Sequence, residues 1–175
     1  MKSKESPNEG NRWLEAIDRS SAWLELGDYE EAARELEGLP EELANHPAIL
    51  WQKHLAAAQK NDWPQALALC EKLIEMLPDE VTFLSYHIGC LYKTGQHEKA
   101  KAELKLRFEQ FPDYPLFHLE AARIFAMEGS IEKAKPHLLR ALQLDENGRI
   151  RLAASKDFDL EKVWEAISNP QSPTL

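Results

Sequence analysis

Apolar and small residues recur along the chain with a period of 34 residues. Small residues at the helix ends (Gly27, Asn61, Gly95, Gly129) and alanines five positions later (Ala32, Ala66, Ala100, Ala134) mark the copies. After each alanine, the fourth residue is apolar, and so is the seventh in every copy except the third, which has Arg107. Since this spacing places them on one face of a helix, the pattern predicts four tandem units, each a helix, a tight turn and a second helix.

The residues at the turns support these helix boundaries. Gly, or Asn in the second copy, can adopt the left-handed conformation that ends a helix. Asp28 with Glu31, and Asp62 with Gln65, have the spacing of capping boxes that start the next helix. We therefore expect a helix to end and another to begin at each turn.

The repeats divide the chain as follows: units at about 13–46, 47–80, 81–114 and 115–148, and a capping segment at 149–167. Residues 11–167 are expected to form a single domain. The polar residues 1–10 and the last residues, 168–175, are expected to be disordered tails. Leu160, Val163, Trp164 and Ile167 have helical spacing and predict a capping helix that covers the open end of the repeats. The alternative is that Trp164 is an exposed binding residue.

The turn sequence Gly-Asp-Tyr-Glu-Glu-Ala at 27–32 and the closing prolines Pro78 and Pro112 resemble the tetratricopeptide repeat family, in particular its small bacterial members. The likeness covers roughly residues 13–146. It departs from the family where Leu84 and His118 replace a common Trp, and where Ser20, His54, Ile88 and Ala122 replace a common Gly. The resemblance implies an all-α fold, a right-handed α–α superhelix or solenoid, that binds other proteins.

In this family the first helices line a concave groove, so the resemblance assigns candidate partner-binding residues by register. They are Trp51, Gln52, Leu55, Tyr86, Tyr92, Lys93, Glu120 and Arg123. Aromatic side chains offer large contact areas with few rotatable bonds, and the polar ones can hold a peptide backbone or charged end. The alternative is that the aromatic residues fill gaps between helices.

Some family members bind acidic C-terminal tails with Lys and Asn at groove positions. Here those positions hold Ile17, Ser21, Gln52, Thr82 and Tyr86, so that clamp is missing. The expected partner is therefore an apolar or basic protein segment. The net charge of −9 is concentrated at the start, since residues 1–46 contain 12 acidic and 5 basic side chains. This balance disfavours nucleic acid and can attract a basic partner, although the glutamates can also serve only to solvate outer helix faces.

No pattern of catalytic, cofactor-binding or metal-binding residues stands out. The six histidines lack the paired spacing of a helical metal site, and Cys70 and Cys90 are expected to be reduced core residues. Phosphate loops and dinucleotide fingerprints are missing, and no apolar run approaches the roughly 20 residues of a membrane span. We expect a cytoplasmic protein without enzymatic activity or cofactor.

The leading interpretation is a scaffold or adaptor that binds another protein in its groove. One alternative is a structural module that self-assembles as a homodimer. Another is a small acidic chaperone that holds apolar segments of an exported client.

Overall fold

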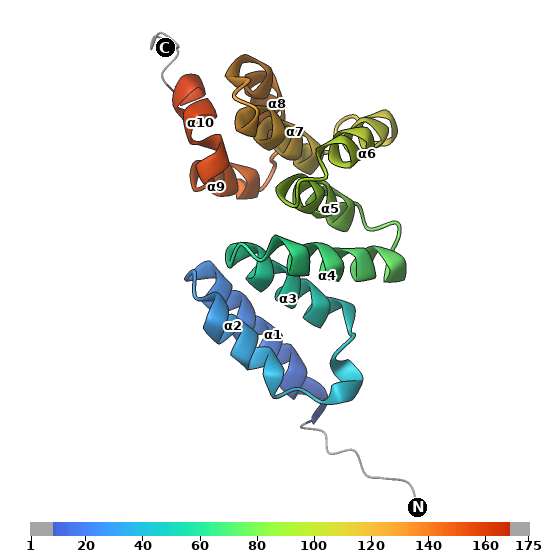
Figure 1. The fold of residues 1–175 in the computed structure, drawn as a ribbon. Helices are drawn as coiled ribbons and strands as arrows, with labels where there is room; N and C mark the ends of the chain where they lie inside the picture. Colours follow the sequence, from blue (N-terminus) through green and yellow to red (C-terminus); the bar gives the residue numbers. More distant parts are fainter. Residues whose placement is uncertain (1–8, 169–175) are drawn as a thin grey trace, which may run out of the picture. The chain divides into compact units, whose positions relative to one another are not determined.

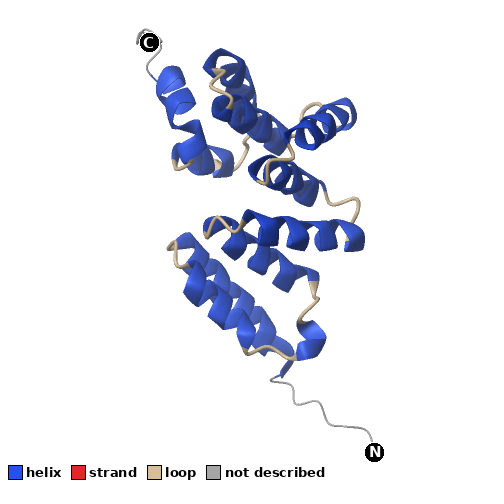
Figure 2. Ribbon diagram, in the orientation of Figure 1, coloured by secondary structure: helices blue, strands red, loops and turns tan. Residues whose placement is uncertain are grey.

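The structure is a computed structural model that describes residues 9–168, and these residues form helices and loops without any strand (Figures 1 and 2). The helices are α1 (Glu9–Glu25), α2 (Tyr29–Glu37), α3 (Pro47–Gln59), α4 (Trp63–Met76), α5 (Val81–Lys93), α6 (His97–Gln110), α7 (Pro115–Met127), α8 (Ile131–Gln143), α9 (Arg149–Ser155) and α10 (Glu161–Ser168). Short 3-10 helices, η1 (Glu41–Leu43) and η2 (Phe158–Leu160), lie in the longer connections. The tails predicted at 1–10 and 168–175 fall mostly outside the described residues.

The helices follow one another as the predicted hairpins. Gly27, Asn61, Gly95 and Gly129 have φ values of 80°, 61°, 80° and 73°, which confirms the left-handed helix ends. The carboxylate of Asp28 accepts a hydrogen bond from the Glu31 amide at 3.1 Å, and Asp62 accepts one from Gln65 at 3.2 Å. These two bonds confirm that both aspartates are N-caps, because each satisfies a backbone donor that the helix leaves open.

The chain divides into two compact units, with the boundary between Phe83 and Leu84. The first unit contains the first two hairpins. In each of them a buried polar side chain of the first helix bonds to a carbonyl of the second helix: Ser20 Oγ donates to Ala32 at 2.9 Å, and His54 Nδ1 lies 2.9 Å from the Ala66 oxygen. In the repeat register, these residues stand where tetratricopeptide repeats commonly have Gly, and each bond satisfies a polar atom in the buried contact.

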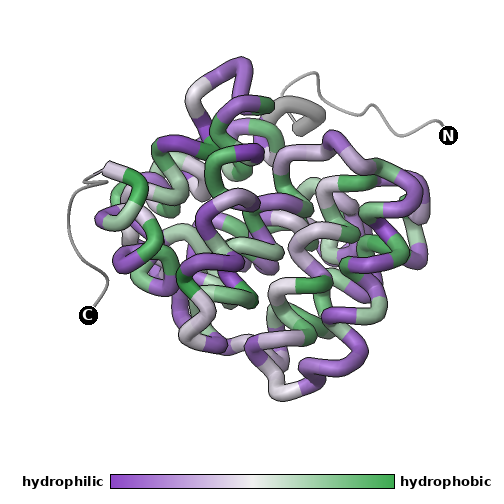
Figure 3. Tube along the Cα trace, turned by 90° about the horizontal axis from the view of Figure 1, so that it is seen from above, coloured by the Kyte–Doolittle hydropathy of each residue, from purple (hydrophilic) through white to green (hydrophobic). Residues whose placement is uncertain are grey.

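The second unit contains the last two hairpins and the C-terminal segment. Its core joins α7, α8, α9 and α10 through buried residues that include Leu138, Ile150, Leu160 and Val163. Trp164 packs against the same cluster, which confirms the capping role predicted for this helix. The contact does not support the alternative in which Trp164 is an exposed binding residue. Figure 3 shows hydrophobic and hydrophilic positions alternating along the helices, as expected when each helix buries one side.

Cys70 and Cys90 are both buried and are not joined in a disulfide, as predicted. Cys70 donates a hydrogen bond from its thiol to the Phe83 carbonyl at 3.2 Å. Between residues 9 and 168, every helix is too short or too polar to cross a membrane.

Candidate functional site

The eight predicted partner-binding residues all lie on first helices of hairpins. Trp51, Gln52 and Leu55 belong to α3, and the other five belong to α5 and α7. The first three are in the first unit and the others in the second, so the structure presents two separate sets of side chains.

In the first unit, Gln52 connects two first helices. Its side chain is only 7% exposed, and its Nε2 donates to Ser21 Oγ of α1 at 2.8 Å. Gln59, two turns later, donates to the Leu24 carbonyl of α1 at 3.1 Å. Trp51 is half-buried, with ring centroids 5.1 Å from His54 and 5.2 Å from Phe83. Gln52 and Gln59 therefore hold α3 against α1, and Trp51 keeps only part of its surface for a ligand.

Other side chains beside this α1–α3 junction are open to solvent. Leu14 is 46% exposed, and Asp18 and Glu25, at helical spacing from it, are also exposed. Leu55 on α3 is half-buried. These four residues, here called the acidic face, combine two apolar side chains with two carboxylates.

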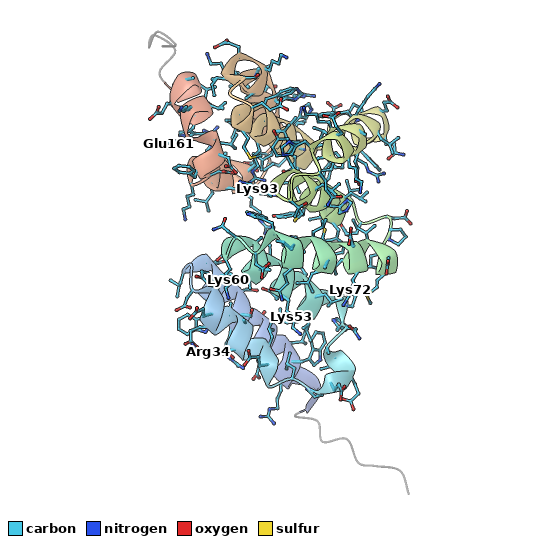
Figure 4. All side chains as sticks on the ribbon, in the orientation of Figure 1. Arg34, Lys53, Lys60, Lys72, Lys93 and Glu161 are labelled. Carbon is cyan, nitrogen blue, oxygen red and sulfur yellow. The ribbon has the colours of Figure 1, made fainter. Side chains whose placement is uncertain are left out.

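The charge of the protein is unevenly divided between the units. Residues 1–83 contain 17 acidic and 8 basic side chains, a net charge of −9, whereas residues 84–175 contain 13 of each. Figure 4 labels four of the basic side chains of the first unit, Arg34, Lys53, Lys60 and Lys72. The whole net charge of the chain therefore belongs to the unit that carries the acidic face.

In the second unit, the C-terminal segment pairs with the charged residues predicted to bind a partner. Lys93, labelled in Figure 4, lies 2.6 Å from Asp159 Oδ2. Arg123 Nε lies 2.5 Å from Asp157 Oδ2, and its guanidinium also pairs with Glu120. Asp157 additionally accepts a hydrogen bond from the Asp159 amide at 3.0 Å, which caps η2. The two aspartates thus attach the cap to α5 and α7.

Glu120 is the most deeply buried of these charges, at 4% exposed. Its burial raises the pKa of the carboxyl group, while the charge of Arg123 opposes that rise. An added Cβ at Gly89 would lie 2.8 Å from Glu120 Oε2, so the glycine on α5 makes room for the carboxylate. Arg123, by contrast, keeps 24% of its side chain exposed.

The two tyrosines of α5 differ in exposure. Tyr92 is 8% exposed and stacks on His97 with ring centroids 4.3 Å apart, and its burial raises its pKa. Tyr86 is half-buried, and desolvation raises its pKa as well. Gln52, Tyr92 and Glu120 therefore contribute mainly to packing, and Lys93 and Arg123 to holding the cap. Trp51, Leu55 and Tyr86 retain exposed surface, and a groove that joins all eight residues stays a prediction.

Sequence reasoning missed the contribution of Asp157 and Asp159 to this region. The only signal in the sequence is the pair of aspartates two residues apart before a helix, a spacing that by itself indicates helix capping. Their ion-pair partners lie on helices far away in sequence. The spacing of residues therefore could not reveal them.

The described residues offer little for metal or thiol chemistry. In residues 9–168, no three His, Cys, Asp or Glu side chains are grouped closely enough to hold a metal ion. Burial raises the pKa of the Cys90 thiol to about 12, so it is protonated at neutral pH and is a poor nucleophile.

Comparison with known proteins agrees with the helical repeats. Residues 57–122 match the family model described as tetratricopeptide repeat. Among solved structures, MamA from residue 41 to its end, from Desulfovibrio magneticus RS-1, is 20% identical with a TM-score of 0.59, over 92% of this chain and 94% of that one. The RS-1 MamA ArsTM double mutant is 20% identical with a TM-score of 0.60, over 94% and 99%. MamA MSR-1 C2 is 22% identical with a TM-score of 0.55, over 76% of both chains. Residues 57–122 therefore carry the sequence pattern of tetratricopeptide repeats, and the chain shares its all-α fold with these structures.

Proposed function

We propose that this protein is a non-catalytic scaffold that binds a segment of another protein, and that the acidic face of the first unit is a principal contact surface. The observation that carries the proposal is the location of the entire net charge of −9 within residues 1–83. Tetratricopeptide repeats are protein-interaction modules, and this charge indicates which kind of segment the first unit prefers.

The acidic face suits a segment with both apolar and basic side chains. Leu14 and Leu55 supply apolar surface, while Asp18 and Glu25 supply carboxylates for Lys or Arg of the partner. Complementary charge accelerates association and fixes the orientation of the bound segment, whereas apolar contact supplies most of the affinity. The preferred partner is therefore an amphipathic basic segment.

Peptide binding tests the proposal directly. Two labelled 14-residue helical peptides would share one face of Leu and Phe and differ in the other, which carries Lys in one and Glu in the other. Fluorescence anisotropy at low salt should show binding of the Lys peptide. Asp18→Lys with Glu25→Lys should weaken that binding about tenfold, the effect expected when two surface charge pairs are lost and repulsion replaces them.

A matched variant in the second unit controls for total charge. Glu132→Lys with Glu165→Lys changes the net charge by the same amount at two exposed positions and should leave binding of the Lys peptide nearly unchanged. Equal loss in both variants would show that only the overall charge matters, and the acidic face would then be the wrong surface. Sedimentation of the same proteins tests the homodimer alternative, since a dimer disrupted only at the acidic face would mean that a second copy occupies it.

The two buried cysteines are not joined in a disulfide, which fits a reducing compartment, because exported proteins commonly pair their cysteines. A cytoplasmic location therefore remains part of this proposal.

A further inference from the structure

A concave surface lies wholly within the second unit. It is a groove of about 630 Å³ between α6 and α8, with α7 as its floor, and we call it the α6–α8 groove. Figure 1 shows α7 between the other two helices. Its lining residues on α6 run from Lys101 to Glu109 at intervals of three or four residues along one helical stripe. That stripe covers about 12 Å, or two helical turns.

The bottom of the groove is apolar. Leu104 and Ile124 are 7% and 2% exposed, and the half-buried side chains of Phe108 and Phe125 also line the groove. The two phenylalanines offer partly exposed aromatic surface of the kind that dominates recognition energetics. The groove can therefore receive large apolar side chains.

The rim of the groove carries more basic than acidic side chains, with Lys101, Lys105 and Lys133 against Glu109 and Glu128. Lys105 and Lys133 are exposed at its edges, and Lys133 lies 5.9 Å above the centre of the Phe125 ring. Lys101 also reaches the rim but is paired with Glu128 at 2.5 Å. Together α6 and α8 carry seven Lys and Arg residues against four Glu, an excess of positive charge in a protein whose net charge is −9.

This surface is distinct from the candidate groove on the first helices. Glu120 and Arg123 of α7 point to the cap, whereas Ile124 and Phe125 line the α6–α8 groove. At 100° per residue, the mean directions of these two pairs differ by about 120° around the helix. The two surfaces therefore use different side chains of α7.

We propose that the α6–α8 groove binds an amphipathic helix of another protein that presents Leu or Phe side chains flanked by Asp or Glu. The length of the lining stripe matches about two turns of such a helix, and helix-in-groove binding uses anchors at the same three- and four-residue intervals. The apolar floor selects the anchors, and Lys105 and Lys133 select the flanking carboxylates. The proposal is independent of the acidic face and has the opposite charge preference.

Labelled peptides test this groove through two charge reversals. The Glu peptide described above, with its Leu and Phe face, should bind the wild-type protein, and Lys105→Glu with Lys133→Glu should weaken it about tenfold. Lys99→Glu with Lys162→Glu is the matched control, because both lysines are exposed and neither lines the groove. A third peptide with Ala in place of Leu and Phe should not bind measurably. Circular dichroism of both variants verifies that they fold.

Several outcomes would overturn the proposal. One is equal weakening in the two double variants, and another is binding of the Ala peptide as tightly as the Leu and Phe peptide, since charge alone would then explain it. Failure of the Glu peptide to bind at low salt would also exclude this partner. If the wild-type protein self-associates in sedimentation and only the groove variant is monomeric, the occupant is a second copy and the proposed partner is wrong.

Discussion

The ion pairs that hold the cap give the most specific prediction about stability. Arg123→Met removes the guanidinium that pairs with both Glu120 and Asp157, whose side chains are 6% and 13% exposed. The Met stem keeps much of the packing volume, so the main loss is electrostatic. The variant leaves the buried Glu120 carboxylate without its principal counter-charge.

The expected size follows from burial. Removing one partner of a buried pair costs about 3 to 5 kcal/mol because an uncompensated charge stays in the interior. The guanidinium of Arg123 is 24% exposed, which favours the lower end. We expect a loss of about 3 kcal/mol, corresponding to a melting temperature about 10 °C lower for a chain of this size. Arg34→Met, at an exposed pair with Glu31, should cost less than about 1 kcal/mol.

The pH dependence tests the mechanism. Burial raises the pKa of Glu120 in the folded protein, and losing Arg123 raises it further. A carboxyl group whose folded pKa is raised stabilises the fold at low pH, and that stabilisation is lost as the pH rises through the folded pKa. The deficit of Arg123→Met relative to wild type should therefore be largest near pH 7.5 and should shrink toward pH 5.

Urea unfolding followed by circular dichroism at both pH values measures these differences. Adding Glu120→Gln to Arg123→Met should recover about half of the lost stability, because no buried charge then remains at position 120. The reasoning would be refuted by a deficit that is the same at pH 7.5 and pH 5, or by a double variant less stable than Arg123→Met.

Three further predictions concern single features of the fold. Gly89→Ala should lower the melting temperature despite a helix-propensity gain of about 1 kcal/mol, because its Cβ would lie 2.8 Å from Glu120 Oε2; an increase would show that the carboxylate can move away. Asp62→Ala removes an N-cap and should cost about 1 kcal/mol in urea unfolding, whereas an unchanged midpoint would mean the cap contributes nothing. Desolvation lowers the pKa of His54 and His118 in the folded protein below 6.5, so the unfolded state binds more protons. The free energy of unfolding should therefore fall as the pH drops below about 6.5. Urea unfolding should show a flatter decline when both histidines are replaced with Gln.

The sequence was sufficient to predict the hairpins because their signals are local. A residue with positive φ, followed by an N-cap, ends one helix and starts the next within a few positions, as at Asn61 and Asp62. The 34-residue period then repeats the same local instruction. The burial of Ala32, Ala66, Ala100 and Ala134 at 0% exposure follows from it, because a small residue lets the paired helices approach closely.

Long-range polar contacts could not be predicted in this way. Lys93 and Asp159 are 66 positions apart, and whether they meet depends on how the cap packs on the last hairpins. The one polar residue in the apolar stripe, Arg107, pairs with Glu103 at 3.4 Å, and Glu103 lies 3.0 Å from His87 Nδ1. Periodicity identified Arg107 as an exception, but only the structure shows that neighbouring charges compensate it.

The separation of charge connects the two proposed surfaces. One unit has a net charge of −9 and the other has none, yet the neutral unit contains an apolar groove whose rim carries three lysines and two glutamates. Surfaces that prefer opposite charges select different segments, since a ligand that suits one surface is repelled by the other. Such a scaffold can therefore bind two different segments without competition between them. Both interactions should weaken with added salt, but only their charge components are screened, and the affinity that persists at high salt measures the apolar contacts of each surface.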